Sequence, residues 1–156
     1  MKLINIMETI EFNSKSATHT ELSNFHWSPF LLDDKMWPTV EHYFQAQKFP
    51  ADPDLQERIR VAKTALGAKR LGKSRTAAFR DDWESIKDTV MYTGIKAKFQ
   101  QNPALATLLA GTGDAWLIEK SRSDSYWGSG PNGCGKNKTG HILMRTRSEL
   151  LSPSMP

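Results

Sequence analysis

The order of hydrophobic and polar residues predicts short strands at the start of the chain. Residues 8–37 alternate apolar and polar positions, which is the period of a strand with one buried face. Within this part, the apolar residues 30–32 and 36–37 are separated by the polar residues 33–35. We therefore expect a short antiparallel sheet with a hairpin here.

Helical signals dominate the rest of the chain. Thr39 can cap a helix running from Val40 to about Phe49, because its hydroxyl can accept a hydrogen bond from a free amide of the first turn. A longer helix is expected to start after Asp81, with Glu84 as its capping partner. The other expected elements are helices over residues 53–62, 64–72, 103–109 and 140–151, a strand over 116–119 and a loop over 121–138.

Length and composition suit one water-soluble domain over residues 1–156, with residues 1–7 and 152–156 frayed. No apolar run approaches the roughly 20 residues of a membrane-spanning helix. Glu8 and Glu11 interrupt any signal-peptide core, and the single cysteine, Cys134, excludes an internal disulfide. We therefore expect a cytoplasmic protein with no membrane partner.

The net charge is only +4, but one segment concentrates positive charge without any intervening acid. This segment, called the basic segment below, contains Arg58, Arg60, Lys63, Lys69, Arg70, Lys73, Arg75 and Arg80. It is either a solvated helical face or a surface for phosphate groups, which lysine and arginine neutralise. Phosphorylated metabolites and nucleic acid both fit the second interpretation.

The helix that begins at Val40 places an acid, an amide and an amine on one face. At about 100° per residue, Glu41, Gln45 and Lys48 fall within one narrow stripe. Such a stripe can be a set of surface ion pairs. Aromatic residues nearby favour partial burial instead, and a buried glutamate and lysine can carry acid/base or covalent chemistry.

The four histidines do not indicate a metal site. His42 has no histidine or carboxylate at ligand spacing on its helix face, so we expect it to be packed or on the surface. The remaining histidines are scattered. We expect no metal and no cofactor.

A glycine-rich loop over residues 128–137 contains G-x-G-x-x-G and nearly a phosphate-binding loop motif. Asn137 stands where the latter needs a hydroxyl, and only 20 residues follow Lys136, too few to complete either nucleotide-binding fold. The loop is therefore not a dinucleotide or nucleoside triphosphate fingerprint. Its backbone amides, with Lys136 and Lys138, could still wrap a phosphate or ribose.

An acid, two aromatics and a glycine precede this loop: Asp124, Tyr126, Trp127 and Gly128. The aromatics either cover a core or stack on a base. The aromatic residues Phe25 and Trp83 leave the same two alternatives open.

Taken in order, these segments closely resemble the YbiA/NADAR family over nearly the whole chain. The matching motifs lie in residues 21–25, 37–49, 83–91, 124–128 and 135–140. The resemblance implies an α+β fold, with several helices around a small, mainly antiparallel sheet. It also implies N-glycosidase activity.

Two substrate groups are associated with this family, namely ribosylaminopyrimidine intermediates of riboflavin synthesis and ADP-ribose attached to guanine in nucleic acid. In both, an exocyclic amine of a guanine-like base is bonded to the anomeric carbon of a phosphorylated ribose. The glycine loop at residues 129–134 is where the family is expected to vary, which leaves the substrate open.

The resemblance implies roles for particular residues. Glu41 is expected to do acid/base work, Asp124 to be the second carboxylate, and Lys48 either to assist or to form a Schiff base with the sugar. The expected substrate-binding residues are Asn24, Phe25, Gln45, Trp83, Tyr126, Trp127, Gly128, Lys136 and Asn137. The alternative is a module that binds ADP-ribose or nucleic acid without chemistry. Oligomeric state and biological role stay open.

Overall fold

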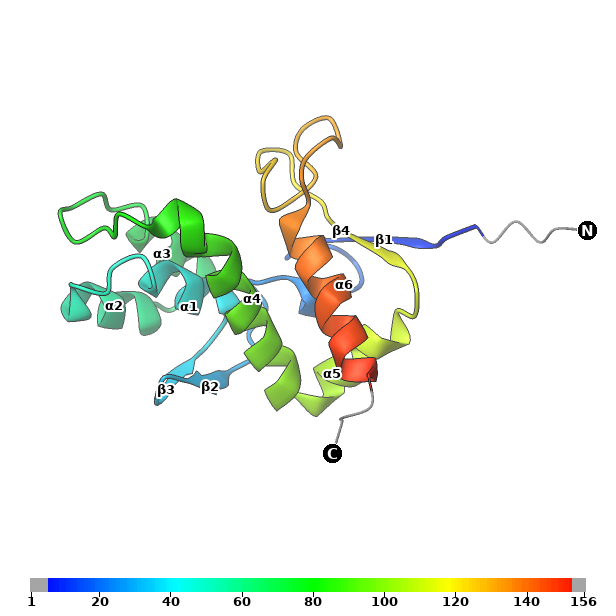
Figure 1. Ribbon diagram of the computed structural model, residues 1–156, viewed down its shortest axis with the longest axis horizontal. Coiled ribbons are helices and arrows are strands. Elements are labelled where there is room, and N and C mark those ends of the chain that lie inside the picture. The colour runs from blue at the N-terminus through cyan, green and yellow to red at the C-terminus, as the bar shows by residue number, and fades with distance from the viewer. Residues whose placement is uncertain (1–5, 153–156) are drawn as a thin grey trace, which may run out of the picture. The chain divides into compact units, whose positions relative to one another are not determined.

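The computed structural model describes residues 6–152, and contacts between residues divide the chain into two compact units (Figure 1). Unit 1 comprises Met1–Ser23 and Ala104–Pro156, and unit 2 comprises Asn24–Pro103. Each unit is described by itself below. That both belong to one domain over residues 1–156 stays a prediction, and the predicted fraying of residues 1–5 and 153–156 lies outside the described residues.

Unit 2 opens with the predicted hairpin. Strands β2 (Phe30–Leu32) and β3 (Lys35–Trp37) pair in antiparallel register, with Phe30 opposite Trp37. Asp33 and Asp34 form the turn with φ angles of 53° and 60°. Two consecutive positive φ angles are those of the tight turn that matches strand twist, and aspartate tolerates them better than most residues.

Four helices complete unit 2: α1 (Val40–Ala46), α2 (Pro53–Arg60), α3 (Ala65–Leu71) and α4 (Trp83–Gln101). The first three start at side chains that accept a hydrogen bond from a first-turn amide, namely Thr39, Asp52 and Thr64. Helix α1 packs against the other three, and all seven of its residues are buried. The unit is therefore built around α1.

One predicted helix end and one predicted helix cap in unit 2 are wrong, although α4 starts after Asp81 as predicted. Helix α1 ends at Ala46 because Lys48 and Phe49 donate their amides three residues back, to Gln45 and Ala46, in a tighter turn. Helix α4 begins at Trp83 without a side-chain cap, and Glu84 pairs with Lys87 instead of capping.

Unit 1 contains a second sheet, whose strands are parallel. Strands β1 (Thr9–Phe12) and β4 (Trp116–Glu119) pair from Thr9 with Trp116 to Phe12 with Glu119. A parallel pair needs a long crossover connection, which the hundred or so residues between these strands supply. Half of the strand pairing is thus parallel, and the sheet predicted as mainly antiparallel is two separate two-stranded sheets.

Helices complete unit 1. Helix α6 (Lys138–Leu151) packs on β4, and α5 (Pro103–Gly111) precedes that strand. A short 3-10 turn, η1 (Thr20–Leu22), follows β1. The α+β class with several helices is confirmed. None of the helices in residues 6–152 has the length and apolar character needed to span a bilayer.

Candidate active site

The predicted stripe on α1 lies inside unit 2. Glu41, Gln45 and Lys48 are only 7%, 4% and 8% exposed, so they do not form a set of surface ion pairs. Helix α1 supplies the first two residues, and the tight turn after it supplies Lys48. An acid, an amide and an amine are therefore held in a largely dry environment.

Hydrogen bonds fix Glu41 from two directions. Its backbone amide donates to the carbonyl oxygen of Asn24, at 3.1 Å, and its Oε1 accepts from Gln45 Nε2, at 2.7 Å. Glu41 also lies in the first turn of α1, where the helix dipole favours a carboxylate. The Gln45 amide therefore orients the carboxylate that the sequence selects for acid/base work.

Lys48 has an amine suited to nucleophilic chemistry. The pKa of Lys48 is lowered to about 8, chiefly by burial and also by the cations of Arg75 and Lys69, while Glu41 opposes the shift. The Lys48 ammonium also lies over two aromatic rings, 5.6 Å from the centroids of both Phe44 and Trp83. A substantial fraction of this amine is thus neutral slightly above neutral pH.

Trp83 is buried against Phe44, with ring centroids 4.9 Å apart, and both rings adjoin Lys48. The predicted stacking of Trp83 on a base stays a prediction. Phe44 was not among the site residues predicted from the sequence, although it precedes Lys48 by four residues. That spacing was the available signal.

Two buried side-chain amide oxygens of unit 2 lack hydrogen-bond partners among the described residues. Asn24 Oδ1 and Gln45 Oε1 accept no hydrogen bond from any described residue. An unpaired buried acceptor costs about 1–3 kcal/mol in the folded protein, so such groups mark places where a ligand donor can bind. A base with N–H groups or a ribose with hydroxyls would satisfy them.

Gly72, at the end of α3, was not selected from the sequence for the site. A Cβ at this position would overlap the side-chain carboxamide of Gln45. Glycine is therefore required so that α3 can approach Gln45 closely. The sequence indicated Gly72 only as a helix stop, because the close approach joins residues 27 positions apart.

In unit 1, Asp124 organises the loop that the sequence selected. Its Oδ1 accepts hydrogen bonds from the backbone amides of Tyr126, at 3.0 Å, and Trp127, at 2.8 Å. The two aromatic rings meet edge to face, with centroids 4.9 Å apart. The structure thus gives Asp124 a loop-shaping role, and its action as a second carboxylate stays a prediction.

The glycine loop is closely packed against the end of β4. A Cβ on Gly128 would lie 2.8 Å from the Glu119 carbonyl oxygen, and a Cβ on Gly135 or Gly140 would overlap backbone carbonyls. Asn137 adopts a left-handed backbone with φ of 51°, accepts from the Glu119 amide and donates to the Leu117 carbonyl. The side-chain oxygen and nitrogen of Asn137 therefore both hold the start of α6 on β4. The predicted role of Asn137 in substrate binding stays a prediction.

Lysines flank the ring of Tyr126. The Nζ atoms of Lys136 and Lys138 lie 5.3 and 5.7 Å from its centroid. This cluster offers an aromatic ring with two cations. That the two lysines, with the backbone amides of the loop, wrap a phosphate or ribose stays a prediction.

The predicted residues thus gather in two groups. Unit 2 brings together Asn24, Glu41, Gln45, Lys48 and Trp83, while Phe25 contacts Lys69 there, its ring centroid 5.9 Å from Nζ. Unit 1 brings together Asp124, Tyr126, Trp127, Gly128, Lys136 and Asn137. That both groups serve one substrate stays a prediction.

His42 is a packed residue, as expected. It is fully buried, its Nδ1 contacts Thr39 Oγ1 at 2.7 Å, and its Nε2 contacts the Ala62 carbonyl oxygen at 2.9 Å. Burial lowers the pKa of His42. The ring therefore joins α1 to the turn after α2.

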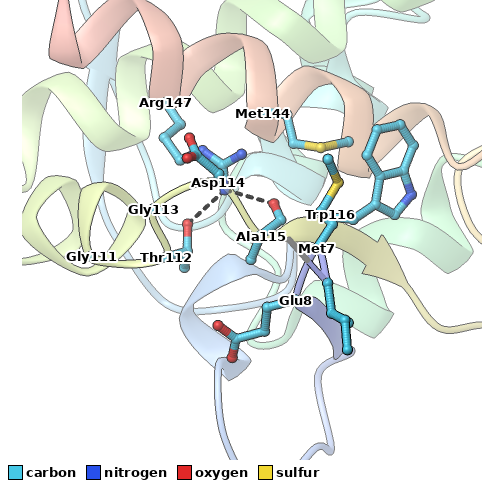
Figure 2. A pocket seen from close by; sticks show the side chains of 11 residues that line it. Met7, Glu8, Gly111, Thr112, Gly113, Asp114, Ala115, Trp116, Met144 and Arg147 are labelled. Atoms are coloured by element: carbon cyan, nitrogen blue, oxygen red, sulfur yellow. Dashed lines mark hydrogen bonds between the residues drawn. The ribbon is translucent and has the colours of Figure 1, made fainter. Parts of the chain in front are cut away.

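Unit 1 also has a surface pocket, and the residues that line it belong to neither of these two groups. It has a volume of about 670 Å³ and is lined mainly by residues around the α5–β4 turn, with Met7 and Glu8 beside them (Figure 2). Arg147 extends into its wall, and Nη1 donates to Thr112 Oγ1 and to the Ala115 carbonyl, both at 2.9 Å. These hydrogen bonds connect α6 to the α5–β4 turn. None of the predicted site residues lines the pocket.

Comparison with known proteins identifies relatives over almost the full chain. A family model described as the NADAR domain matches residues 11–151. An N-glycosidase YbiA of Shigella boydii serotype 4 (strain Sb227) is 45% identical over 141 residues, which cover 90% of this chain and 88% of the relative. A riboflavin biosynthesis protein of Vibrio vulnificus (strain YJ016) is 42% identical over 147 residues, covering 94% of this chain but 40% of that longer protein.

The fold is also similar to a solved structure. The NMR structure of the E. coli protein YbiA superposes with a TM-score of 0.83 at 42% sequence identity. The match covers 93% of this chain and 86% of that one.

Proposed function

This chain belongs to the NADAR family and is an N-glycoside hydrolase, and we propose that the bond it cleaves joins a phosphorylated ribose or ADP-ribose to an exocyclic amine of a guanine-like base. The proposed substrates are ribosylaminopyrimidine phosphates related to riboflavin synthesis and ADP-ribosylated guanine in DNA or RNA. Both present the same amine and the same anomeric carbon.

The buried Glu41 and Lys48 are the observation that carries this proposal. Burying an acid and an amine costs stability, and a module that only binds an anionic ligand gains little from a buried carboxylate. Cleavage of a ribosyl C–N bond, by contrast, requires a proton donor for the departing nitrogen. The arrangement therefore favours an enzyme over the alternative of a non-catalytic ADP-ribose or nucleic-acid binding module.

The lowered pKa of Lys48 favours the covalent route. The neutral Nζ attacks the anomeric carbon, the bond from that carbon to the base nitrogen breaks, and the base nitrogen takes a proton from Glu41. The lysine nitrogen returns one proton to the Glu41 carboxylate and passes its second proton to the ring oxygen as the bond from that oxygen to the anomeric carbon breaks, so the sugar remains bound as an open-chain imine. Water then adds to the imine carbon, which releases the sugar aldehyde and restores the free amine.

The remaining predicted residues complete the proposal. Asn24 and Gln45 offer their unpaired oxygens to donors on the substrate, while Trp83, Tyr126 and Trp127 stack against the base or sugar. Asp124 orients ribose hydroxyls, and Phe25, Gly128, Lys136 and Asn137 line the substrate. We also propose a cytoplasmic location.

One experiment tests the activity and the choice of substrate. The protein is incubated in parallel with ADP-ribosylated guanine DNA and with ribosylaminopyrimidine phosphate, and release of the free base is followed. We expect turnover of at least one substrate and its loss in the Glu41→Gln variant. Glu84→Gln is the matched control, because it removes a carboxylate that is exposed on α4 and paired with Lys87.

Binding of both substrates without turnover would support the non-catalytic module instead. Borohydride tests the covalent route, because it reduces an imine to a stable secondary amine. We expect an adduct on Lys48 with the mass of the reduced sugar portion of the substrate, because the base has already left when the imine forms. No adduct, or an adduct that maps elsewhere, would exclude this route.

A further inference from the structure

We propose that Lys69 and Arg75 form a phosphate-binding subsite beside Lys48, which holds the phosphate carried by the ribose of the substrate. This inference rests on the proposed function for the identity of the ligand. It selects two of the eight cations in the basic segment, and all of the residues involved belong to unit 2.

The end of α3 places both cations near the catalytic helix. Lys69 lies in the last turn of α3, and Arg75 follows in the next loop. Between them, Gly72 abuts the side chain of Gln45 on α1. Arg75 Nη1 donates to the carbonyl oxygen of Gly72, at 2.9 Å, so the guanidinium is tied to the residue that contacts Gln45.

Lys48 lies within Coulomb range of both cations. Arg75 and Lys69 both lower the pKa of its amine, and Glu41 is the acidic group that opposes them. Three cations and one carboxylate therefore share this region. The excess of positive charge favours binding of an anion.

Both cations are held in place while their charges stay accessible. Lys69 is exposed, and its Nζ lies 5.9 Å from the ring centroid of Phe25. The exposed Arg75 guanidinium lies 4.4 Å from the ring centroid of Phe79, and its Nη1 also donates to the Ser74 carbonyl. Its Nε and Nη2 donors make no hydrogen bond to the described residues, and they suit two oxygens of one phosphate.

Acidic partners already neutralise other members of the basic segment. Arg60 pairs with Glu57 and Arg80 pairs with Asp82. Among the described residues, neither Lys69 nor Arg75 forms an ion pair with a carboxylate. Lys69 and Arg75 therefore combine unneutralised charge with proximity to Lys48.

The test compares a ribosylaminopyrimidine phosphate with its dephosphorylated form, using the full chain. For the phosphorylated substrate, Lys69→Ala and Arg75→Ala should each raise KM about tenfold, because each removes a charge-assisted hydrogen bond. For the dephosphorylated substrate the change should be under threefold. Lys73→Ala is the matched control, since it removes an exposed charge from the same part of the chain and should change KM less than either.

Equal losses on both substrates, or an equal loss in Lys73→Ala, would overturn the subsite. Arg75→Lys keeps the charge and should retain part of the preference for the phosphorylated form. If the unmodified protein turns over neither of these substrates and does not release guanine base from ADP-ribosylated DNA either, that result would instead count against the proposed function.

Phosphate binding gives a readout that does not depend on turnover. Calorimetry with inorganic phosphate and with ribose 5-phosphate should detect binding to the unmodified chain that is lost in the Lys69→Ala/Arg75→Ala double variant. Binding that survives in this variant would overturn the assignment. In Arg75→Ala, the midpoint of the pH dependence of kcat/KM should also move upward, because a cation that lowers the pKa of Lys48 is gone.

Discussion

Gln45 Nε2 donates a hydrogen bond of 2.7 Å to Glu41 Oε1, one helical turn away on α1. This hydrogen bond fixes the orientation of the Gln45 side-chain amide. The oxygen of the same amide, Oε1, faces Gly72 and has no hydrogen-bond partner among the described residues. Helix α3 thus supports the orientation of the Glu41 carboxylate indirectly, because Gly72 abuts Gln45 and Gln45 bonds Glu41.

Gly72→Ala should damage activity through Gln45. The new methyl group would overlap the Gln45 carboxamide and displace it, so we expect kcat to fall at least tenfold and the free energy of unfolding to fall by about 1–3 kcal/mol. Kinetics and urea denaturation measure the two effects. Gly111→Ala is the control, because a Cβ there meets open space, and it should leave kcat unchanged. Normal kcat in Gly72→Ala would show that Gln45 does not position Glu41.

Lys48→Met should abolish turnover and stabilise the fold. The pKa of Lys48 is about 8 in the folded protein and near 10.5 when unfolded, so folding must keep the amine deprotonated or hold a costly buried charge. Below pH 8 the gain in unfolding free energy should be roughly 1–3 kcal/mol, since one pKa unit corresponds to about 1.4 kcal/mol.

The sign of this effect follows from proton binding. Between about pH 8 and 10.5 the unfolded chain binds the Lys48 proton and the folded chain does not, so the stability of the unmodified protein rises with pH in this window. The advantage of Lys48→Met should therefore shrink across the same window. Denaturation at pH 7, 9 and 10.5 checks it, and an advantage that does not vary with pH would contradict the assigned pKa.

The pH dependence of kcat/KM should report Lys48 in the free enzyme. If its neutral amine attacks the sugar, the rate rises about tenfold per pH unit and levels off above about 8. Initial rates from pH 6 to 9.5 measure this profile. A rate that falls above pH 8 would instead identify the protonated lysine as the reactive form.

Asn137→Ala should destabilise unit 1. The substitution removes hydrogen bonds to Glu119 and Leu117 and leaves alanine with a left-handed backbone, so we expect a loss of about 2–4 kcal/mol of unfolding free energy. Denaturant unfolding tests it, with the exposed Lys136→Ala as the control for stability. A loss below 0.5 kcal/mol would mean that the amide is available for substrate binding instead.

The sequence by itself determined the features that depend on neighbours along the chain. The 3.6-residue period placed Glu41 and Gln45 on one face, Thr39 specified the start of α1, and two polar residues specified the β2–β3 turn. Local geometry is encoded within a few residues, so these predictions needed no tertiary contact. The motifs also indicated the family from the sequence.

Only the tertiary structure decided the features that depend on distance between remote residues. It buried the Glu41–Lys48 stripe, brought Gly72 against Gln45 and selected Lys69 and Arg75 from the basic segment as the cations near Lys48. It also paired β1 with β4 in parallel. Burial, close approach and Coulomb interactions depend on separations in space, and spacing along the chain does not encode these separations.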